Sequence, residues 1–294
     1  MKLQERPTSR SPARSGSRAL TRLVRGQPVS DGAGVKLNRL IGQRGFDMLD
    51  PFLMFDEFRS DKANDYLAGF PEHPHRGFET VTYMLAGRMR HGDNQGNSGL
   101  LTPGSVQWMT AGRGIVHSEM PEQQDGLMWG FQLWVNLPAR DKMTAPRYQE
   151  ISPRQIPLVK PARGVEVRVI AGSLGGVAGP VSGVPTAPVY FDLALAAGAH
   201  IEVPLASGHS AFAYVYDGVA AIGSEKDPGI VQHGELGVLG EGSHVRVAAG
   251  AETSRLLVIA GKPLNEPVAK YGPFVMNTPQ QIVEAIRDFQ NGAF

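Results

Sequence analysis

The chain has 294 residues, 41% of them hydrophobic and 19% charged, with a formal net charge of +1. That length suits two domains, the composition excludes global disorder, and the near-zero charge argues against direct nucleic acid binding, because phosphate backbones are bound by concentrated basic surfaces. The chain contains no cysteine, which excludes disulfides, thiolate metal ligands and cysteine nucleophiles, so any metal must be held by imidazole and carboxylate groups.

Residues 1–18 are rich in Ser, Arg and Pro and almost free of apolar residues, which predicts a flexible basic tail. No apolar run approaches the roughly 20 residues that span a bilayer, and the basic N-terminus lacks the apolar region of a secretory signal. We therefore expect no membrane partner and a cytoplasmic protein, or a nuclear one if the source is eukaryotic.

The 36 glycines and 22 prolines are spread between short apolar runs, a texture typical of an all-β protein. They punctuate two β-rich blocks, and the Pro- and charge-rich residues 138–161 indicate a connector between them. We assign an N-terminal domain to residues 19–145 and a C-terminal domain to residues 146–294. The clearest expected strands are 80–85, 106–109, 131–135, 190–195, 212–216, 245–247 and 256–259.

Two pairs of polar residues in the first block have the spacing of metal ligands. Residues i and i+2 of an extended chain project to the same side, so His73 can converge with His75, and His117 with Glu119. If hairpins place the two segments side by side, three imidazoles and one carboxylate meet inside a barrel. That donor set suits Fe(II), Mn(II), Ni(II) or Cu(II) with positions left open for substrate. A single His-x-His pair is more often a surface or core feature, and it is the second pair that favours a metal site.

Glu79 has three open roles: a fifth ligand, a carboxylate that orients a ligand imidazole, or a strand residue paired with an arginine. We favour the last two. The remaining histidines are expected to have solvent or turn roles: His91, His200, His209, His233 and His244.

Two short segments recur in the same order in both blocks. The segment TYMLAG at 82–87 resembles AYVYDG at 213–218, and PGSV at 103–106 resembles HGEL at 233–236. Each similarity is weak alone, but their shared order and spacing indicate a duplicated β-unit, as in a double jelly roll.

One helix is expected, at 279–289. Thr278 is placed to cap its N-terminus, Pro279 suits the first helical position and Gln281 completes a capping box. Ile282, Ile286 and Phe289 share one face, which is expected to pack on a sheet.

Several of these segments together resemble the pirin family. The similarity is carried by DPFLMFDEF at 50–58, HPHRGFETVTYML at 73–85, PGSVQWMTAGRGIVHSEMP at 103–121, LWVNLP at 133–138 and GPFVMNT at 272–278. It implies two cupin barrels in tandem, each a double-stranded β-helix or jelly roll, with a C-terminal α-helix. It also implies one iron ion on His73, His75, His117 and Glu119. The matching positions of the second block carry no ligands; they fall near Pro204, Ala206, Val247 and Ala249.

The resemblance implies a quercetin 2,3-dioxygenase-like enzyme that opens a small aromatic, flavonol-like substrate with dioxygen and releases carbon monoxide. Fe(II) is favoured, with Mn, Ni, Cu, Co or Zn as alternatives. The metal would acidify the flavonol hydroxyl, and Glu119 is the candidate general base. An apolar wall of the pocket is expected from Phe70, Phe78, Trp108 and Met109, with core packing as the competing role.

Other pirins resemble regulatory proteins, which gives a second hypothesis. A change in the oxidation state of the iron would alter the local charge and bias a surface that binds a transcription factor or a metabolic enzyme. Arg76, Arg113 and the basic tail are the candidates for that surface. The sequence does not separate the two hypotheses, because both need the same four ligands.

Overall fold

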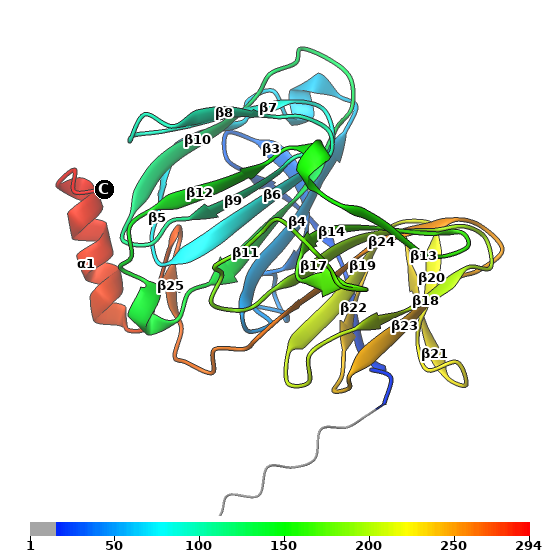
Figure 1. The fold of residues 1–294 in the computed structure, drawn as a ribbon. Helices are drawn as coiled ribbons and strands as arrows, with labels where there is room; N and C mark the ends of the chain where they lie inside the picture. The colour runs from blue at the N-terminus through cyan, green and yellow to red at the C-terminus, as the bar shows by residue number, and fades with distance from the viewer. Residues whose placement is uncertain (1–15) are drawn as a thin grey trace, which may run out of the picture.

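A seven-stranded and a four-stranded antiparallel sheet form the first barrel of the computed structural model, which describes residues 16–294 (Figure 1). The larger sheet has the order β12 (Arg147–Ile151), β9 (Val106–Thr110), β6 (Phe78–Ala86), β11 (Met128–Asn136), β4 (Phe52–Ser60), β3 (Val35–Ile41) and β2 (Gln27–Asp31). The smaller sheet has the order β5 (Phe70–His75), β10 (Ile115–Pro121), β7 (Met89–Asp93) and β8 (Ser98–Leu101).

The second barrel repeats this arrangement. Its larger sheet has the order β1 (Leu20–Arg25), β22 (Glu235–Leu239), β19 (Ser210–Asp217), β24 (Ser254–Gly261), β17 (Val189–Leu195), β14 (Val165–Ala171) and β13 (Leu158–Ala162). Its smaller sheet has the order β18 (His200–Pro204), β23 (His244–Ala249), β20 (Val219–Gly223) and β21 (Pro228–Gln232). A short hairpin of β15 (Ser173–Leu174) and β16 (Val177–Ala178) follows β14.

The two strand orders confirm the predicted all-β fold and its duplication. The repeated segments at 82–87 and 213–218 lie at the ends of β6 and β19, and those at 103–106 and 233–236 lead into β9 and β22. β6 and β19 occupy the same place in their sheets, as do β9 and β22. All seven expected strands are present, each within a longer observed strand.

The two barrels exchange strands at their edges. β1, from the start of the chain, pairs with β22 of the second barrel, and β12, which follows the first barrel in sequence, pairs with β9 of the first. The predicted connector at 138–161 contains regular structure: β12, most of β13 and two 3₁₀ turns, Ala139–Asp141 and Pro153–Gln155. A third such turn is Ala63–Asp65. The domain boundaries at 18/19 and 145/146 stay predictions.

The predicted tail at 1–18 falls mostly outside the described residues, which begin at Gly16. Arg18 is an ordered exception. Its side chain is buried and its guanidinium donates to the carbonyl oxygens of Ala206, His209, Gly240 and Gly242. Because these four backbone acceptors hold the Arg18 side chain, they also fix the position at which β1 joins the second barrel.

The main core lies between the two large sheets. Phe55 of β4 is fully buried, with its ring centroid 5.4 Å from that of Phe212 and 5.3 Å from that of Tyr214 in β19. Buried hydrogen bonds cross the same interface in both directions, since Tyr83 donates to Asp192 and Tyr214 donates to Glu57. Burial raises the pKa of Asp192, so this carboxylate depends on the hydroxyl groups that surround it.

The last segment of the chain leaves the second barrel and returns to the first, where Figure 1 shows the terminal helix beside β5. It forms the hairpin of β25 (Ala269–Tyr271) and β26 (Phe274–Met276), then α1 (Pro279–Gln290). The predicted cap is confirmed, with Thr278 and Gln281 forming the reciprocal capping box. Ile282 and Ile286 pack on Phe274 and Met276 of this hairpin.

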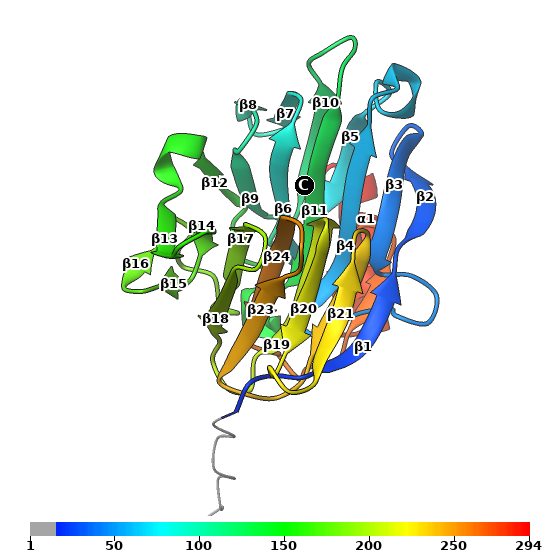
Figure 2. The same ribbon diagram turned by 90° about the vertical axis from the view of Figure 1, so that its right-hand side faces the viewer.

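Figure 2, turned by a quarter, views the molecule from the side of the second barrel, with β1 running beside β21. Among the described residues, no helix combines the length and apolar character needed to cross a bilayer.

Candidate metal centre

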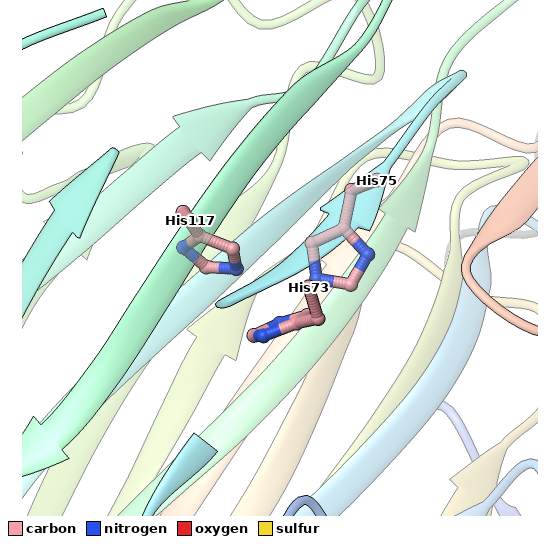
Figure 3. A group of neighbouring side chains, drawn as sticks. All are labelled: His73, His75 and His117. Atoms are coloured by element: carbon pink, nitrogen blue, oxygen red, sulfur yellow. The ribbon is translucent and has the colours of Figure 1, made fainter. Parts of the chain in front are cut away.

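Three histidines meet in the first barrel (Figure 3). His73 and His75 lie on β5, and His117 lies on the adjacent β10, with His73 and His117 as direct partners in the strand register. The ring centroids are 4.7 Å (His73–His75), 4.4 Å (His73–His117) and 5.0 Å (His75–His117) apart. One nitrogen of each ring lies within 4.8 Å of one nitrogen of each of the others, which is a grouping that a metal ion could join.

The environment of the rings favours the neutral imidazoles that metals require. Burial, together with the neighbouring imidazoles, lowers the pKa of His75 and of His117 well below the ordinary value. The Nδ1 of His73 lies 2.7 Å from the carbonyl oxygen of Pro71, to which it can donate a proton. That bond leaves the Nε2 lone pair of His73 free for a ligand.

The unpaired ring nitrogens fit a metal. Both nitrogens of His117 and Nδ1 of His75 are buried without a hydrogen-bond partner among the described residues. Buried polar groups are nearly always satisfied, so such unpaired nitrogens need an explanation. A coordinated cation would provide it, because imidazole is a common ligand of divalent transition metals.

Glu119 lies near the three histidines but does not join their group. It is buried on β10, where a bulge separates it from His117 in the pairing with β5. Its Oε1 accepts a hydrogen bond from Thr82 (2.9 Å) and its Oε2 accepts one from Gln132 (3.0 Å). Its role as fourth ligand therefore stays a prediction.

A cavity of about 810 Å³ opens beside the cluster and is lined in part by His73, His75 and Glu119. Its other walls mix apolar side chains with the ion pair of Arg39 and Asp56, joined at 2.8 Å. The larger aliphatic and aromatic lining residues include Leu37, Leu53, Met54, Phe58, Phe70, Met89, Trp134 and Val275.

The predicted apolar wall is only partly in place. Phe70 lines the cavity. Phe78 is buried behind it, packed on Trp134 (centroids 4.4 Å apart) and on His75 (5.1 Å). Trp108 belongs to the core between the barrels, and Met109 packs with Ile115. Trp108 and Met109 therefore pack in the core and do not line the cavity.

Glu79 lies on the opposite face of β6 from Thr82, because side chains alternate along a strand. It is buried, its Oε1 accepts from Thr110 at 2.7 Å, and burial raises its pKa. The extended geometry that would align it with His75 is broken at Gly77, which has a φ of 89°. Glu79 is therefore placed as a structural residue of the strand.

Arg76 does not present its charge on an open surface, as the regulatory hypothesis expected. Its side chain is buried, donates to the carbonyl oxygen of Arg113 and pairs with Asp288 of α1 at 2.8 Å. Its guanidinium also lies 4.4 Å from the centre of the Phe294 ring. Arg76 thus anchors the C-terminal helix beside the metal centre.

His91 corrects another expectation. We predicted a solvent or turn role, but its ring is buried inside the barrel, against the carboxylate of Glu150 and stacked on Tyr148 at 5.6 Å. It is the register partner of Glu119 on β7. A single histidine between charged residues gave no periodic signal from which this burial could be predicted.

The second barrel is filled where the first is hollow. The facing residues of β18 and β23 are buried and apolar, among them Ile201, Val203, Val245 and Val247. Among the described residues, the three histidines of the first barrel are the only such cluster of candidate ligands.

The buried Lys142 connects the β25–β26 hairpin to the segment that follows His75. The Nζ of Lys142 donates to the carbonyl oxygens of Gly77 (2.7 Å) and Val275 (2.9 Å) and to Oδ1 of Asn136 (2.7 Å). A Cβ atom at Gly77 would lie 2.0 Å from the Val275 oxygen, so only glycine permits this approach. The wall of the cavity is thus fastened directly to the strand that carries His75.

Burial lowers the pKa of Lys142 to about 7. In the unfolded chain the lysine has its ordinary pKa of about 10.4. Between about pH 7 and pH 10.4 the unfolded chain therefore binds more protons than the folded protein, and the free energy of unfolding rises with pH. We expect Lys142→Met to flatten this rise, measured as urea midpoints at pH 7 and pH 9. The exposed Lys36 provides the control, Lys36→Met, which should keep the slope. Equal slopes in wild type and Lys142→Met would contradict the assignment.

Comparison with known proteins gives matches over both barrels. Residues 34–135 match the family model Pirin, and residues 190–294 match the Pirin C-terminal cupin domain. The chain is 52% identical over 279 residues to a pirin-like protein of Caulobacter vibrioides, covering 94% of this chain and 99% of that protein. It is 43% identical over 278 residues to human pirin, covering 94% and 93%.

Among solved structures, a quercetin 2,3-dioxygenase from Acinetobacter baumannii has a TM-score of 0.86 at 33% identity, covering 95% of this chain and 98% of that one. The similarity therefore includes both barrels and the C-terminal segment that closes the first.

Proposed function

Since this chain belongs to the pirin family, we propose that it is a metal-dependent dioxygenase of the quercetin 2,3-dioxygenase type. The observation that carries the proposal is a cluster of three histidines, two of which, His73 and His75, line a largely apolar cavity. The similarity to the Acinetobacter quercetin 2,3-dioxygenase supports a flavonol-like substrate. The proposed reaction opens the central ring with dioxygen and releases carbon monoxide.

The proposed ligands are His73, His75, His117 and Glu119. Fe(II) is the proposed ion, and Mn, Ni, Cu, Co or Zn are the alternatives. When bound, the metal would supply Lewis acidity toward a substrate hydroxyl and access to dioxygen chemistry.

The residues of the chain have separate tasks in this proposal. Phe70 and Trp134 offer aromatic faces on the cavity wall against which a flat substrate can lie. Glu119 lines the same cavity and is the proposed base that accepts the hydroxyl proton of the substrate. Its low exposure keeps water from competing for that proton.

Anaerobic mixing of the metal-loaded protein with quercetin, followed by oxygen, tests the proposal. We expect one molecule of carbon monoxide for each quercetin consumed, measured by gas analysis and by loss of the flavonol absorbance. Protein treated with a chelator is the control and should be inactive. Absence of turnover with all six metals would contradict the dioxygenase assignment.

A regulatory protein partner and a cytoplasmic location stay predictions. The buried position of Arg76 removes one of the residues on which the regulatory surface was to depend.

A further inference from the structure

We infer that Thr82 and Gln132 are positioning residues that decide whether Glu119 turns toward the metal or away from it. The inference rests on the proposed metal centre and concerns how its carboxylate is controlled. Thr82 lies on β6 and Gln132 on β11, and the two residues are direct partners in the strand register. They face Glu119 of β10 across the interior of the barrel.

The three side chains form a closed set of contacts. Thr82 Oγ1 lies 2.9 Å from Glu119 Oε1 and 2.7 Å from Gln132 Oε1. Gln132 Nε2 lies 3.0 Å from Glu119 Oε2. Thr82 and Glu119 are almost fully buried, so water cannot readily replace a missing partner.

This set has too few protons for all its contacts. A threonine hydroxyl carries one proton, whereas an ionised carboxylate and an amide oxygen only accept. Thr82 can therefore donate to Glu119 or to Gln132, but not fully to both. The amide group of Gln132 has no such conflict, because its nitrogen faces Glu119 and its oxygen faces Thr82.

Two arrangements follow from this accounting. In the first, Thr82 donates to Glu119, and both carboxylate oxygens are held away from the histidines. In the second, the Thr82 hydroxyl rotates to Gln132 and frees Oε1 of Glu119 to act as a ligand, while Gln132 still holds Oε2. Gln132 is thus the pivot of the carboxylate, and Thr82 is the group that retains or releases it.

This assignment explains why Glu119 lies outside the histidine group although its neighbours on β5 and β10 converge. It also predicts that the two positioning residues have opposite effects. Loss of the Thr82 hydroxyl removes only the arrangement that holds Glu119 away. Loss of the Gln132 amide removes the alternative acceptor for the Thr82 hydroxyl, so Thr82 keeps its hydrogen bond to Glu119.

Co(II) binding, followed by visible absorption without any flavonol, tests the inference. We expect Thr82→Val to bind Co(II) about tenfold more tightly than wild type, because a hydrogen bond to a buried charge no longer competes with the metal. Gln132→Met should bind about tenfold more weakly. Thr82→Ser keeps the hydroxyl and should restore the wild-type affinity and spectrum.

Thr80→Val is the matched control, since Thr80 is a buried threonine on the same face of β6 without a contact to Glu119. It should leave the affinity unchanged. A merely structural role of the contacts predicts weaker binding for both Thr82→Val and Gln132→Met, and that result, or an unchanged affinity in Thr82→Val, would overturn the inference. A wild-type protein that binds no Co(II) would instead overturn the metal centre, and inactivity toward quercetin with normal Co(II) binding would overturn only the proposed reaction.

Discussion

Replacement of His117 by alanine is expected to abolish tight metal binding. His117 is the only imidazole of the cluster that comes from β10, so its loss leaves two imidazoles of β5 and, of the proposed ligands, only the carboxylate of Glu119 to hold the ion. Changes to residues that only support a ligand typically cost 10–100-fold in metal affinity, and loss of a ligand should cost more than about 100-fold. Metal content after dialysis, by elemental analysis, is the measurement.

His209→Ala is the matched control for this prediction. His209 lies between β18 and β19 of the second barrel, away from the three-histidine cluster. Its replacement should leave one metal per chain. Full metal content in His117→Ala would show that the histidine cluster is not the metal site, and loss of metal in His209→Ala would show that the effect is not specific to the cluster.

The second large effect is expected at the interface between the barrels. Phe55→Ala should lower the free energy of unfolding by about 3–5 kcal/mol, because a fully buried aromatic ring is replaced by a cavity that its neighbours cannot fill. The ring contacts both sheets, with Phe131 of its own barrel stacked at 5.9 Å and Phe212 of the other at 5.4 Å.

Urea unfolding followed by fluorescence measures this difference. Val283→Ala, on the exposed face of α1, is the control and should change the free energy by less than about 0.5 kcal/mol. A similarly small change in Phe55→Ala would mean that the two sheets do not form one cooperative core.

The features that could be predicted from sequence were local. Strands such as 131–135 and 190–195 were evident from their apolar runs, and the helix from the Thr278 cap and its Ile282–Ile286 face. The common direction of His73 and His75 followed from the alternation of side chains in one extended segment, whereas their meeting with His117 depended on the pairing of two segments distant in sequence. Each of these inferences needs only neighbouring residues and one regular geometry.

The features that were missed depend on contacts between distant segments. Thr82 and Gln132 are ordinary strand residues, and only the pairing of β6 with β11 brings both to Glu119. The pairing of β1 with the second barrel could not be predicted from residues that begin the N-terminal domain in sequence, and the pairing of β12 with the first barrel could not be predicted from residues that resemble a connector. Glu79 would share the face of His75 only if the strand stayed extended, and one glycine, Gly77, resets the alternation between two strands.

The hairpin at 269–276 has a consequence for the order in which the protein is made. Domains tend to fold from the N-terminus as the chain leaves the ribosome. The strands with His73 and His117 are therefore synthesised long before Tyr271 and Val275, which complete the wall of their cavity. A nascent chain can thus gather its histidines early, but the wall of their cavity is complete only after residues 269–276 have also been synthesised.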